Sequence, residues 1–549
     1  MAVTTETRPA DVGLRREMGL IGAIWSSEGS IIGSGWLFGA LLAVQFAGTA
    51  GILAWVIVGI MFAFLALVYS ELGAMYPVAG GTGRFPHFAY GSVAGISFGF
   101  FAWVQAVTVA PIECFAVLQY ASYWWHSVYN ADKGVTTGAG YAVSIGLLAI
   151  FTIINFLGIR WLARTNSTVT WWKIAIPLLT IIVLLTKFHG NNFGVGGFMP
   201  YGVKGLFEAM VLGGVAFALL GFEQADQLAG EVKDPQKTLP RAIIGAMIIG
   251  TAIYVLLQVA FIAALPHSQL AHGFAHISNA NILAGPWAGL AGLVGFGWLA
   301  FLLRIDAVVS PAGTGLIYVT STSRVGYGLA RNRYYPQIFA RVDKRGVPWI
   351  SLILAFLIGI FFLLPFPSWK SLVGLVTTAS VLMYAGGPLS LGALRKQVPE
   401  ANRPYRLGWA TVLAPLSFIM ANVLIYFSGF TVIWKLGVVL VIGYVLIGIF
   451  MMYDKQRPPL DWKSASWLPV YLIGMGLISW EGQYSGESST APPLNLSNLP
   501  LWWDLAAVAG FSLIIYYWAM AVRAPRKDVL ELVARQSGVT EEAARPVGH

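Results

Sequence analysis

The chain has little charge and almost no cysteine. Only 11% of its 549 residues are Asp, Glu, Lys or Arg, while 57% are hydrophobic, and the mean hydropathy is +0.71. Soluble chains of this length do not have such a composition, which is typical of a polytopic membrane protein. The one cysteine, Cys114, excludes an internal disulfide framework and any site that needs several cysteine ligands, such as an iron–sulfur cluster.

Polar stretches long enough for a separate soluble domain are also missing. Apolar stretches near the roughly 20 residues needed to cross a bilayer recur instead, and we expect about fourteen spans in an all-α bundle. The expected spans lie at about 17–46, 49–76, 93–124, 140–158, 166–188, 206–230, 241–265, 290–328, 349–366, 371–394, 410–430, 434–453, 465–481 and 500–522. No small-residue cleavage site follows a short apolar core, so we expect no removable signal peptide.

The net charge of +10 reflects membrane topology. With the N-terminus inside and the spans alternating, the inner loops, the inner ends of the spans and both tails hold 27 of the 34 Lys and Arg residues. Cytoplasmic loops carry such an excess. We therefore expect a multi-pass protein of the cell membrane with both termini in the cytoplasm, and no binding of nucleic acid.

The first span is interrupted by the stretch "SSEGSIIGSGWLFG" (26–39). Backbone breaks inside a membrane occur only where they line a cavity or are buried in protein. Unwinding at Gly33, Ser34 and Gly35 would expose N–H groups at the start of a new half-helix, which suits a carboxylate. Carbonyls freed near Ile31 and Ile32 would suit a cation or ammonium group. The break thus offers both poles that a zwitterion needs, although such glycines also occur as helix-packing residues.

The sixth span is interrupted in the same way. It reads "AMVLGGVAFALLGFEQADQLAGEVKDP" and lies five spans after the first. A pair of interrupted spans at matching positions indicates an inverted repeat with a binding site at the bilayer midplane.

Several segments resemble the amino acid–polyamine–organocation superfamily. They are "IIGSGWLFG" (31–39), "YSELGAMYPVAGGTGRFPHFAYG" (69–91), "ALLGFEQADQLAGEVKDPQKTLPRAI" (218–243), "TSRVGYGLARNRYYPQIFARVDKRGVPW" (322–349) and "LRKQVPEANRPYR" (394–406). The resemblance spans roughly residues 17–453 and implies an amino acid permease with a LeuT-like fold and alternating access. The domain organisation that follows is an N-terminal tail (1–16), two inverted five-helix repeats (17–188 and 206–394), helices 11 and 12 (410–453), two extra helices (465–522) and a C-terminal tail (523–549).

The resemblance also implies a set of substrate contacts. Gly33, Ser34 and Gly35 would hold the substrate carboxylate, and carbonyls near Ile31, Ile32, Ala218 and Leu219 would hold its amine. The second break, which contains Gly221, would shape the side-chain pocket. Phe222 or Phe217 would be the aromatic side chain that covers the site, and the sequence does not choose between them.

Lys173, in "TWWKIAIPLLT" (170–180), lies within the fifth span. Desolvation favours the neutral form of a lysine in hydrocarbon, so it can exchange a proton near neutral pH. The resemblance implies that a fifth-helix lysine occupies the place where sodium-coupled relatives hold an ion, and Glu28 is a candidate partner. Lys173 could instead extend to the inner interface or form a structural pair, and sodium remains the competing coupling ion.

Further charged residues lie within the expected spans, among them Glu113, Arg304 and Asp306. Intramembrane ionisable residues are candidates for function, but they could also form structural pairs. Because positions i and i+2 do not share a helix face, we expect Arg304 and Asp306 to have separate partners. If Arg304 faces the cavity it could bind a second carboxylate, which would favour aspartate or glutamate as substrate.

Other signals indicate no cofactor and no metal. His267, His272 and His276 share an outer loop, but no acidic residue or cysteine stands close enough to complete a metal site. The glycines of "GGTGRF" (80–85) lack the context of a nucleotide-binding loop. The scattered buried charges do not form the cluster that a membrane enzyme needs, and an ion channel does not explain two broken helices.

We therefore expect a secondary active amino acid transporter rather than an enzyme. The sequence favours proton-coupled symport, with acidic amino acids such as aspartate or glutamate as candidate substrates. The expected partners of the protein are an amino acid, protons and the lipid bilayer. An amino acid or amine exchanger and a sodium-coupled organic-ion transporter remain alternatives. The sequence does not decide the substrate, the role of the two extra C-terminal helices, or whether the protein is a monomer or a homodimer.

Overall fold

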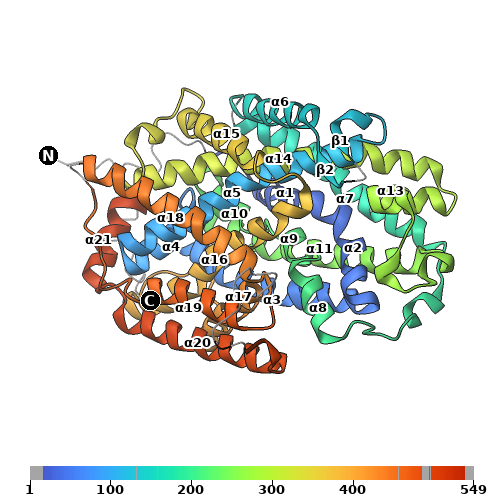
Figure 1. Cartoon of the computed structure of the whole chain (residues 1–549). Coiled ribbons are helices and arrows are strands. Elements are labelled where there is room, and N and C mark those ends of the chain that lie inside the picture. Colours follow the sequence, from blue (N-terminus) through green and yellow to red (C-terminus); the bar gives the residue numbers. More distant parts are fainter. Residues whose placement is uncertain are drawn as a thin grey trace.

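The computed structural model of the chain is a bundle of helices (Figure 1). It describes residues 16–130, 133–157, 159–454, 457–484, 494 and 496–537. The predicted N-terminal tail up to residue 15, the end of the predicted C-terminal tail from residue 538, and residues 485–493 and 495 lie outside the described residues.

Almost all regular structure in the described residues is helical. The α-helices are α1 (Leu20–Ile31), α2 (Ser34–Ala47), α3 (Gly51–Met75), α4 (Gly81–Tyr90), α5 (Ser92–Ala121), α6 (Gly138–Asn155), α7 (Ile159–Leu185), α8 (Gly202–Val211), α9 (Val215–Ala218), α10 (Gln224–Gln227), α11 (Pro235–Ala264), α12 (Ala280–Ala284), α13 (Pro286–Leu293), α14 (Gly297–Arg331), α15 (Trp349–Leu363), α16 (Trp369–Gln397), α17 (Ala410–Phe427), α18 (Phe430–Tyr453), α19 (Trp467–Glu481), α20 (Leu501–Val522) and α21 (Arg526–Ser537). Short 3₁₀ helices lie at Gly48–Ala50, His126–Val128, Gly190–Gly194, Ala229–Glu231, His267–Leu270, Phe274–His276, Gln337–Ala340 and Leu496–Asn498. Two short strands, β1 (Tyr129–Asn130) and β2 (Val135–Thr136), pair antiparallel, with Tyr129 opposite Thr136.

Ten helical stretches of the described residues are long and apolar enough to cross a membrane, and α15 is apolar but shorter. Each of them overlaps an apolar stretch that the sequence predicts, and Ser34–Met75 overlaps two. The prediction of an all-helical polytopic membrane protein is therefore confirmed.

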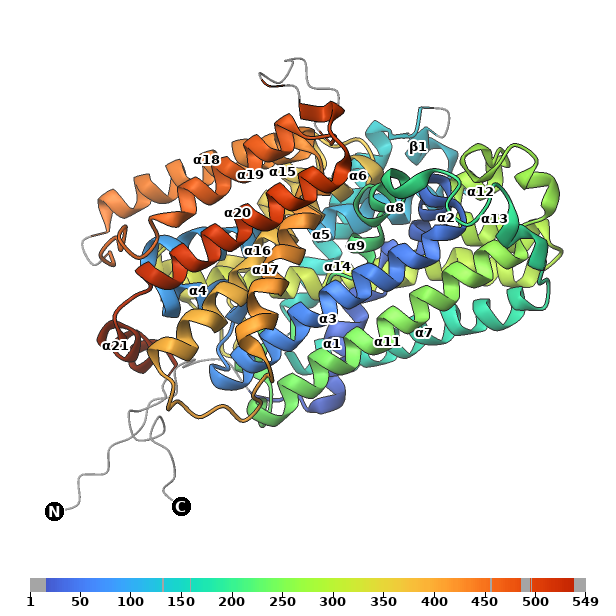
Figure 2. The ribbon, with the colours of Figure 1, turned by 90° about the horizontal axis from the view of Figure 1, so that it is seen from below.

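The two ends of the bundle carry different short elements. At one end, which we call the α21 end, α21 contacts α4, and the N–H of Ala524 donates to the carbonyl of Ala89 over 3.2 Å. At the opposite end, which we call the α13 end, lie α8, α12, α13 and the β1–β2 pair (Figure 2). The α4 segment, which contains "GGTGRF", is a fully buried helix.

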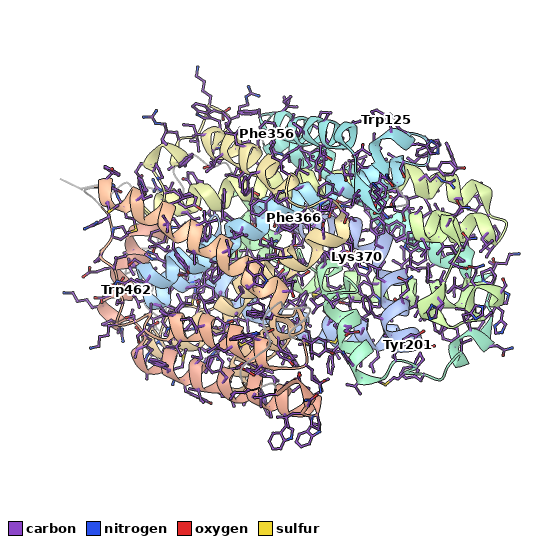
Figure 3. All side chains as sticks on the ribbon, viewed as in Figure 1. Trp125, Tyr201, Phe356, Phe366, Lys370 and Trp462 are labelled. Atoms are coloured by element: carbon purple, nitrogen blue, oxygen red, sulfur yellow. The ribbon has the colours of Figure 1, made fainter. Side chains whose placement is uncertain are left out.

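Large aromatic side chains lie towards both ends (Figure 3). Trp462 lies towards the α21 end, while Trp125 and Tyr201 lie towards the α13 end. Trp462 and Trp125 are 58% and 51% exposed. This is the distribution expected of aromatic belts at two membrane interfaces.

The C-terminal helices form one flank of the bundle. Figure 2 shows α18, α19 and α20 on the side opposite α7 and α11. Buried polar side chains tie this flank to α17: Asn422 donates to the Ser512 hydroxyl over 2.9 Å, and the Tyr471 hydroxyl donates to Asn422 over 2.6 Å. Hydrogen bonds between neutral side chains are a common means of joining helices in a membrane.

Candidate functional site

The two predicted breaks exist and touch each other. The first separates α1 from α2 at Ile32 and Gly33, and the second separates α9 from α10. A Cβ on Gly35 would lie only 2.5 Å from the Cα of Ala218. Gly221 has a φ of 121°, and a Cβ there would lie 2.6 Å from the Cβ of Ser30. Glycine is required at both positions, because any side chain would force the two interrupted segments apart.

A protein carboxylate occupies the start of α2. Glu113, on α5, accepts the backbone N–H of Ser34 at 2.9 Å and the Ser34 hydroxyl at 3.0 Å, and its side chain is buried. The first N–H groups of a helix favour negative charge at this point. The carboxylate of Glu113, which the sequence analysis names only as a candidate charge partner, thus lies where the sequence predicts the carboxylate of a substrate.

Lys173, on α7, lies at the end of α1. Its Nζ donates to the carbonyl of Gly29 and, over 2.7 Å, to the hydroxyl of Thr314 on α14. Thr314 in turn donates to the same Gly29 carbonyl over 2.9 Å. The lysine is fully buried, and its ammonium group meets a carbonyl of the interrupted helix.

The predicted pairing of Glu28 with Lys173 is wrong as a direct contact. Within the described residues, neither carboxylate oxygen of Glu28 has a hydrogen-bond partner, although the side chain is fully buried. Oε1 lies beside α11, 3.7 Å from where a Cβ on Gly250 would stand. Glu28 comes immediately before Gly29, but its side chain leaves α1 towards a different helix.

Arg304 and Asp306 have separate partners, as predicted. The carboxylate of Asp306 accepts hydrogen bonds from the indole of Trp172 at 2.8 Å and from the hydroxyl of Ser310 at 2.8 and 2.9 Å. The Arg304 guanidinium lies over the ring of Tyr123, with its carbon 3.7 Å from the ring centre. Arg304 is half-buried and does not line the cavity between the breaks. It therefore does not supply a second carboxylate site there.

A cavity of about 10 Å³ lies between the two breaks, which is about the room that one water molecule needs. It is lined by Ser30, Ile31, Gly33, Gly35, Val109, Glu113, Phe217, Leu220, Thr314 and Tyr318. An amino acid is far larger, so the interrupted segments must move apart before one can enter.

The two candidate aromatic side chains lie differently with respect to the cavity. Phe217 lines the cavity, whereas Phe222 lies away from it and stacks on Tyr384 with a ring separation of 4.7 Å. The carbonyl of Ile31 accepts the Tyr254 hydroxyl at 2.7 Å and is thereby engaged by α11. Among the predicted substrate contacts, those that do not line the cavity in this conformation are Ile32, Ser34, Ala218, Leu219, Gly221 and Phe222.

Trp369 closes the site on its α2 side and is absent from the sequence prediction. It starts α16, its indole donates to the Ser34 hydroxyl over 2.7 Å, and its ring lies 4.9 Å from that of Phe38 and 5.4 Å from that of Phe217. A tryptophan at the start of a span is typical of an interfacial belt, so nothing in the sequence distinguishes this one. Thr314 is also absent from the sequence prediction.

The path towards the α21 end is closed as well. Glu223 accepts the Tyr384 hydroxyl at 2.5 Å and the N–H of Gly221 at 3.0 Å. Further along, Arg324 of α14 and Glu231 form an ion pair of 2.8 Å in which both side chains are 1% exposed. The site is thus shut off from both ends of the bundle.

Removal of one partner of this buried ion pair is expected to be costly. Arg324→Leu leaves the Glu231 charge buried and unpaired, which lowers the free energy of unfolding by about 3–5 kcal/mol. The loss of stability is measured as a fall in the thermal unfolding temperature of the purified protein. The double variant Arg324→Leu/Glu231→Leu should recover most of the lost stability. Arg345→Gln is the matched control, because the 3.7 Å pair of Arg345 with Asp343 is largely exposed. Equal unfolding temperatures for Arg324→Leu and the control would contradict the prediction.

Comparison with known proteins places the chain in a family. A family model described as amino acid permease matches residues 18–450. The chain is 37% identical over 521 residues to the glutamate/serine transporter AimA of Bacillus subtilis, an alignment that covers 92% of this chain and 94% of that protein. It is 36% identical over 523 residues to the aspartate-proton symporter of the same organism, covering 94% and 98% of the two chains. It is also 25% identical over 464 residues to the branched-chain amino acid permease BcaP of Bacillus subtilis. The interrupted helices and these matches lead to one conclusion: the chain belongs to the amino acid permease family.

Proposed function

We propose that the chain is a secondary active amino acid transporter that couples uptake to protons and works by alternating access. The observation that carries the proposal is the position of Lys173, whose ammonium group joins the end of α1 to Thr314 of α14. A proton that leaves Lys173 removes the charge that strengthens these two hydrogen bonds, and a proton that enters restores it. Protonation is thereby coupled to the mobility of the interrupted helix.

Sodium coupling fits this position less well. Sodium needs several oxygen ligands, and the Gly29 carbonyl and Thr314 hydroxyl are the oxygens that face this point. A lysine ammonium already engages both, and its positive charge would repel a second cation.

Acidic amino acids are the proposed substrates. The two relatives with 36–37% identity are named for glutamate and serine and for aspartate and protons. Arg304 does not serve such a substrate, because it stacks on Tyr123. Lys173 supplies a positive charge beside the cavity, through its bond to the lining residue Thr314.

Glu113 provides a second coupling between proton and substrate. Its carboxylate holds the Ser34 N–H that a substrate carboxylate would need, and two adjacent carboxylates repel each other. Protonation of Glu113 removes its charge and frees the donor. Substrate binding at the start of α2 therefore requires a proton on Glu113.

The proposed architecture is the LeuT-like one. It has fourteen spans, with two inverted five-helix repeats at 17–188 and 206–394, further helices at 410–453 and 465–522, and both termini in the cytoplasm. The contact between the two breaks supports this arrangement, as does the excess of Lys and Arg in the loops at the α21 end.

The test is uptake of a panel of radiolabelled amino acids into proteoliposomes, with an imposed pH gradient and then with a sodium gradient. Saturable uptake of aspartate or glutamate, driven by the pH gradient and independent of sodium, is the expected result. Uptake that requires sodium would overturn proton symport in favour of sodium coupling. Uptake that occurs only after the vesicles are preloaded with another amino acid would overturn it in favour of exchange.

Glu113→Gln should separate substrate binding from its proton. The amide is always neutral, so binding of aspartate is expected to lose its dependence on pH between pH 5 and pH 8, and accumulation is expected to fall by about tenfold or more. Binding measured by ligand-induced thermal stabilisation at several pH values checks this. The control is Gln119→Glu, a substitution in the half-buried outer part of α5. Gln105→Glu is unsuitable because it adds a buried charge. A variant that keeps the pH dependence of the unmodified protein would contradict the role of Glu113.

A further inference from the structure

Three glycines mark a packed side and an open side of α18. A Cβ on Gly443 would lie only 2.0 Å from the ring of Phe100 on α5, so the two helices touch there. A Cβ on Gly437 or on Gly448 would meet nothing within 4 Å. At about 3.6 residues per turn these two glycines share one side of α18, roughly 120° away from Gly443. That side of the helix faces open space.

The open space is a cavity of about 530 Å³ between α5, α18 and α19. Its volume lies within the range of roughly 300–1,000 Å³ that ligand sites have. Figure 2 shows α18 and α19 side by side on one flank of the bundle. Val441 and Ile473, which line the cavity, are 61% and 63% exposed, so the cavity opens on the outer surface of the bundle. Because α5 and α18 are long and apolar enough to cross a membrane, this surface faces lipid.

The lining of the cavity suits a hydrocarbon chain. Leucines from two helices contribute to it, among them Leu440 of α18 and Leu468 of α19. The hydroxyl groups in the lining are bonded within the protein: Tyr444 donates to Ser97 over 2.8 Å, and Ser97 donates to the carbonyl of Val93 over 2.9 Å. Because the bilayer core holds no water, a lipid acyl chain is the occupant that this lining fits.

The cavity reaches the membrane interface at the α21 end. On α18 its lining runs from Gly437 to Met451, a length of about 21 Å at 1.5 Å per residue. Trp462 also lines the cavity, and it lies towards the α21 end of the bundle (Figure 3). Tryptophan is typical of the boundary between hydrocarbon and headgroups. A lipid with one chain in the cavity therefore has its headgroup beside Trp462.

Two basic side chains stand at this end of the cavity. Nη1 of Arg457 donates to the carbonyl of the lining residue Met451 over 3.1 Å, which holds the exposed guanidinium at the end of α18. Lys463 directly follows Trp462 and is exposed. A guanidinium group binds phosphate through several N–H donors at once, and a lysine adds a point charge. The headgroup position thus suits a phosphate.

The loop between α18 and α19 carries an excess of positive charge. Residues 454–463 contain three basic and two acidic residues. One of the acids, Asp461, accepts the backbone N–H of Ser92 at 2.8 Å and is thereby engaged at the start of α5. Basic residues next to a membrane surface attract anionic headgroups. The charge at the end of the cavity therefore favours an anionic lipid over a zwitterionic one.

We propose that the cavity between α5, α18 and α19 is a binding site for a phospholipid with an anionic headgroup. One acyl chain of the lipid fills the cavity, and the phosphate lies at Arg457 and Lys463. The bound lipid supplies the packing that α18 lacks on its open side and so stabilises this flank of the bundle. The site is separate from the cavity between the two breaks, and the proposal does not depend on proton coupling.

The experiment titrates the purified whole protein in detergent with phosphatidylglycerol and follows the thermal unfolding temperature, which rises as the lipid binds. Phosphatidylcholine with the same acyl chains tests the charge of the headgroup, and glycerol 3-phosphate tests the headgroup without chains. Gly448→Leu fills the cavity from its open side, and Arg457→Gln removes one charge. The matched control is Gly245→Leu on α11, at the opposite flank, where a Cβ also meets nothing within 4 Å.

Phosphatidylglycerol is expected to bind Gly245→Leu as it binds the unmodified protein, and to bind Gly448→Leu and Arg457→Gln about tenfold or more weakly. Phosphatidylcholine is expected to bind the unmodified protein about tenfold more weakly than phosphatidylglycerol, and glycerol 3-phosphate to cause no shift. Because the readout is the shift that the lipid causes, a variant of lower stability is still informative.

Three results would overturn the proposal. Unchanged binding of phosphatidylglycerol to Gly448→Leu would place the acyl chain outside the cavity. Equal shifts with the two phospholipids would indicate unspecific lipid contact, and a full shift with glycerol 3-phosphate would indicate a simple anion site.

Discussion

Replacement of Lys173 by methionine is expected to abolish accumulation of amino acids driven by a pH gradient. The methionine side chain has a similar length but no titratable proton and no charge, so the hydrogen bonds to Gly29 and Thr314 are lost. A reduction of about tenfold or more follows if Lys173 carries the coupling proton. Uptake of labelled aspartate into proteoliposomes at an imposed pH gradient measures it.

Lys187→Met is the control for this variant. Lys187 follows the end of α7 and lies over the ring of Phe296 at 5.4 Å, away from both breaks. The Lys187→Met variant should accumulate aspartate as the unmodified protein does. Full pH-driven accumulation by Lys173→Met, with the protein shown to be folded, would rule out the lysine as the coupling group.

Gly35→Ala is expected to have the second large effect. Its Cβ would stand 2.5 Å from the Cα of Ala218, a backbone atom that cannot turn aside. The contact forces α2 away from α9 and costs about 1–3 kcal/mol in the free energy of unfolding. Because these two segments form the site, transport is expected to fall close to background, while stability falls only moderately.

Gly510→Ala provides the comparison, since a Cβ at Gly510 meets nothing within 4 Å. This variant should match the unmodified protein in both transport and unfolding temperature, or gain slightly from the better helix propensity of alanine. Unchanged aspartate uptake by Gly35→Ala would show that the two breaks do not need to touch.

The sequence predicts the broken helices because their cause is local. Gly33, Ser34 and Gly35 within an apolar span, and a second glycine-rich span five later, are visible without any tertiary contact. Lys173 is also identified from the sequence alone, because a lysine within an apolar span stands out and needs a partner. The all-helical class follows directly from hydropathy.

The side chains that complete the site come from distant parts of the chain and could not be predicted. Glu113 and Ser34 are 79 residues apart, and Trp369 and Ser34 are 335 apart. Which helix faces meet depends on rotations of helices that hydropathy does not report. Whether Phe217 or Phe222 lines the cavity depends on the turn at Gly221, whose geometry a sequence does not specify.

The buried charges illustrate the same limit. The spacing of Arg304 and Asp306 correctly predicts that the two side chains have separate partners, because it depends only on the geometry of one helix. The predicted contact between Glu28 and Lys173 fails because it depends on which side of α1 the carboxylate leaves. The position of a residue along its helix can be read from the sequence, whereas the direction in which its side chain leaves the helix axis cannot.

The central claim is that an amino acid and a proton move together through this protein. The most direct measurement is the internal pH of proteoliposomes, read with a trapped dye, when aspartate is added outside in sodium-free buffer. Saturable acidification of the interior that is absent in Lys173→Met is the predicted result. Accumulation of aspartate without any change in internal pH would contradict the account.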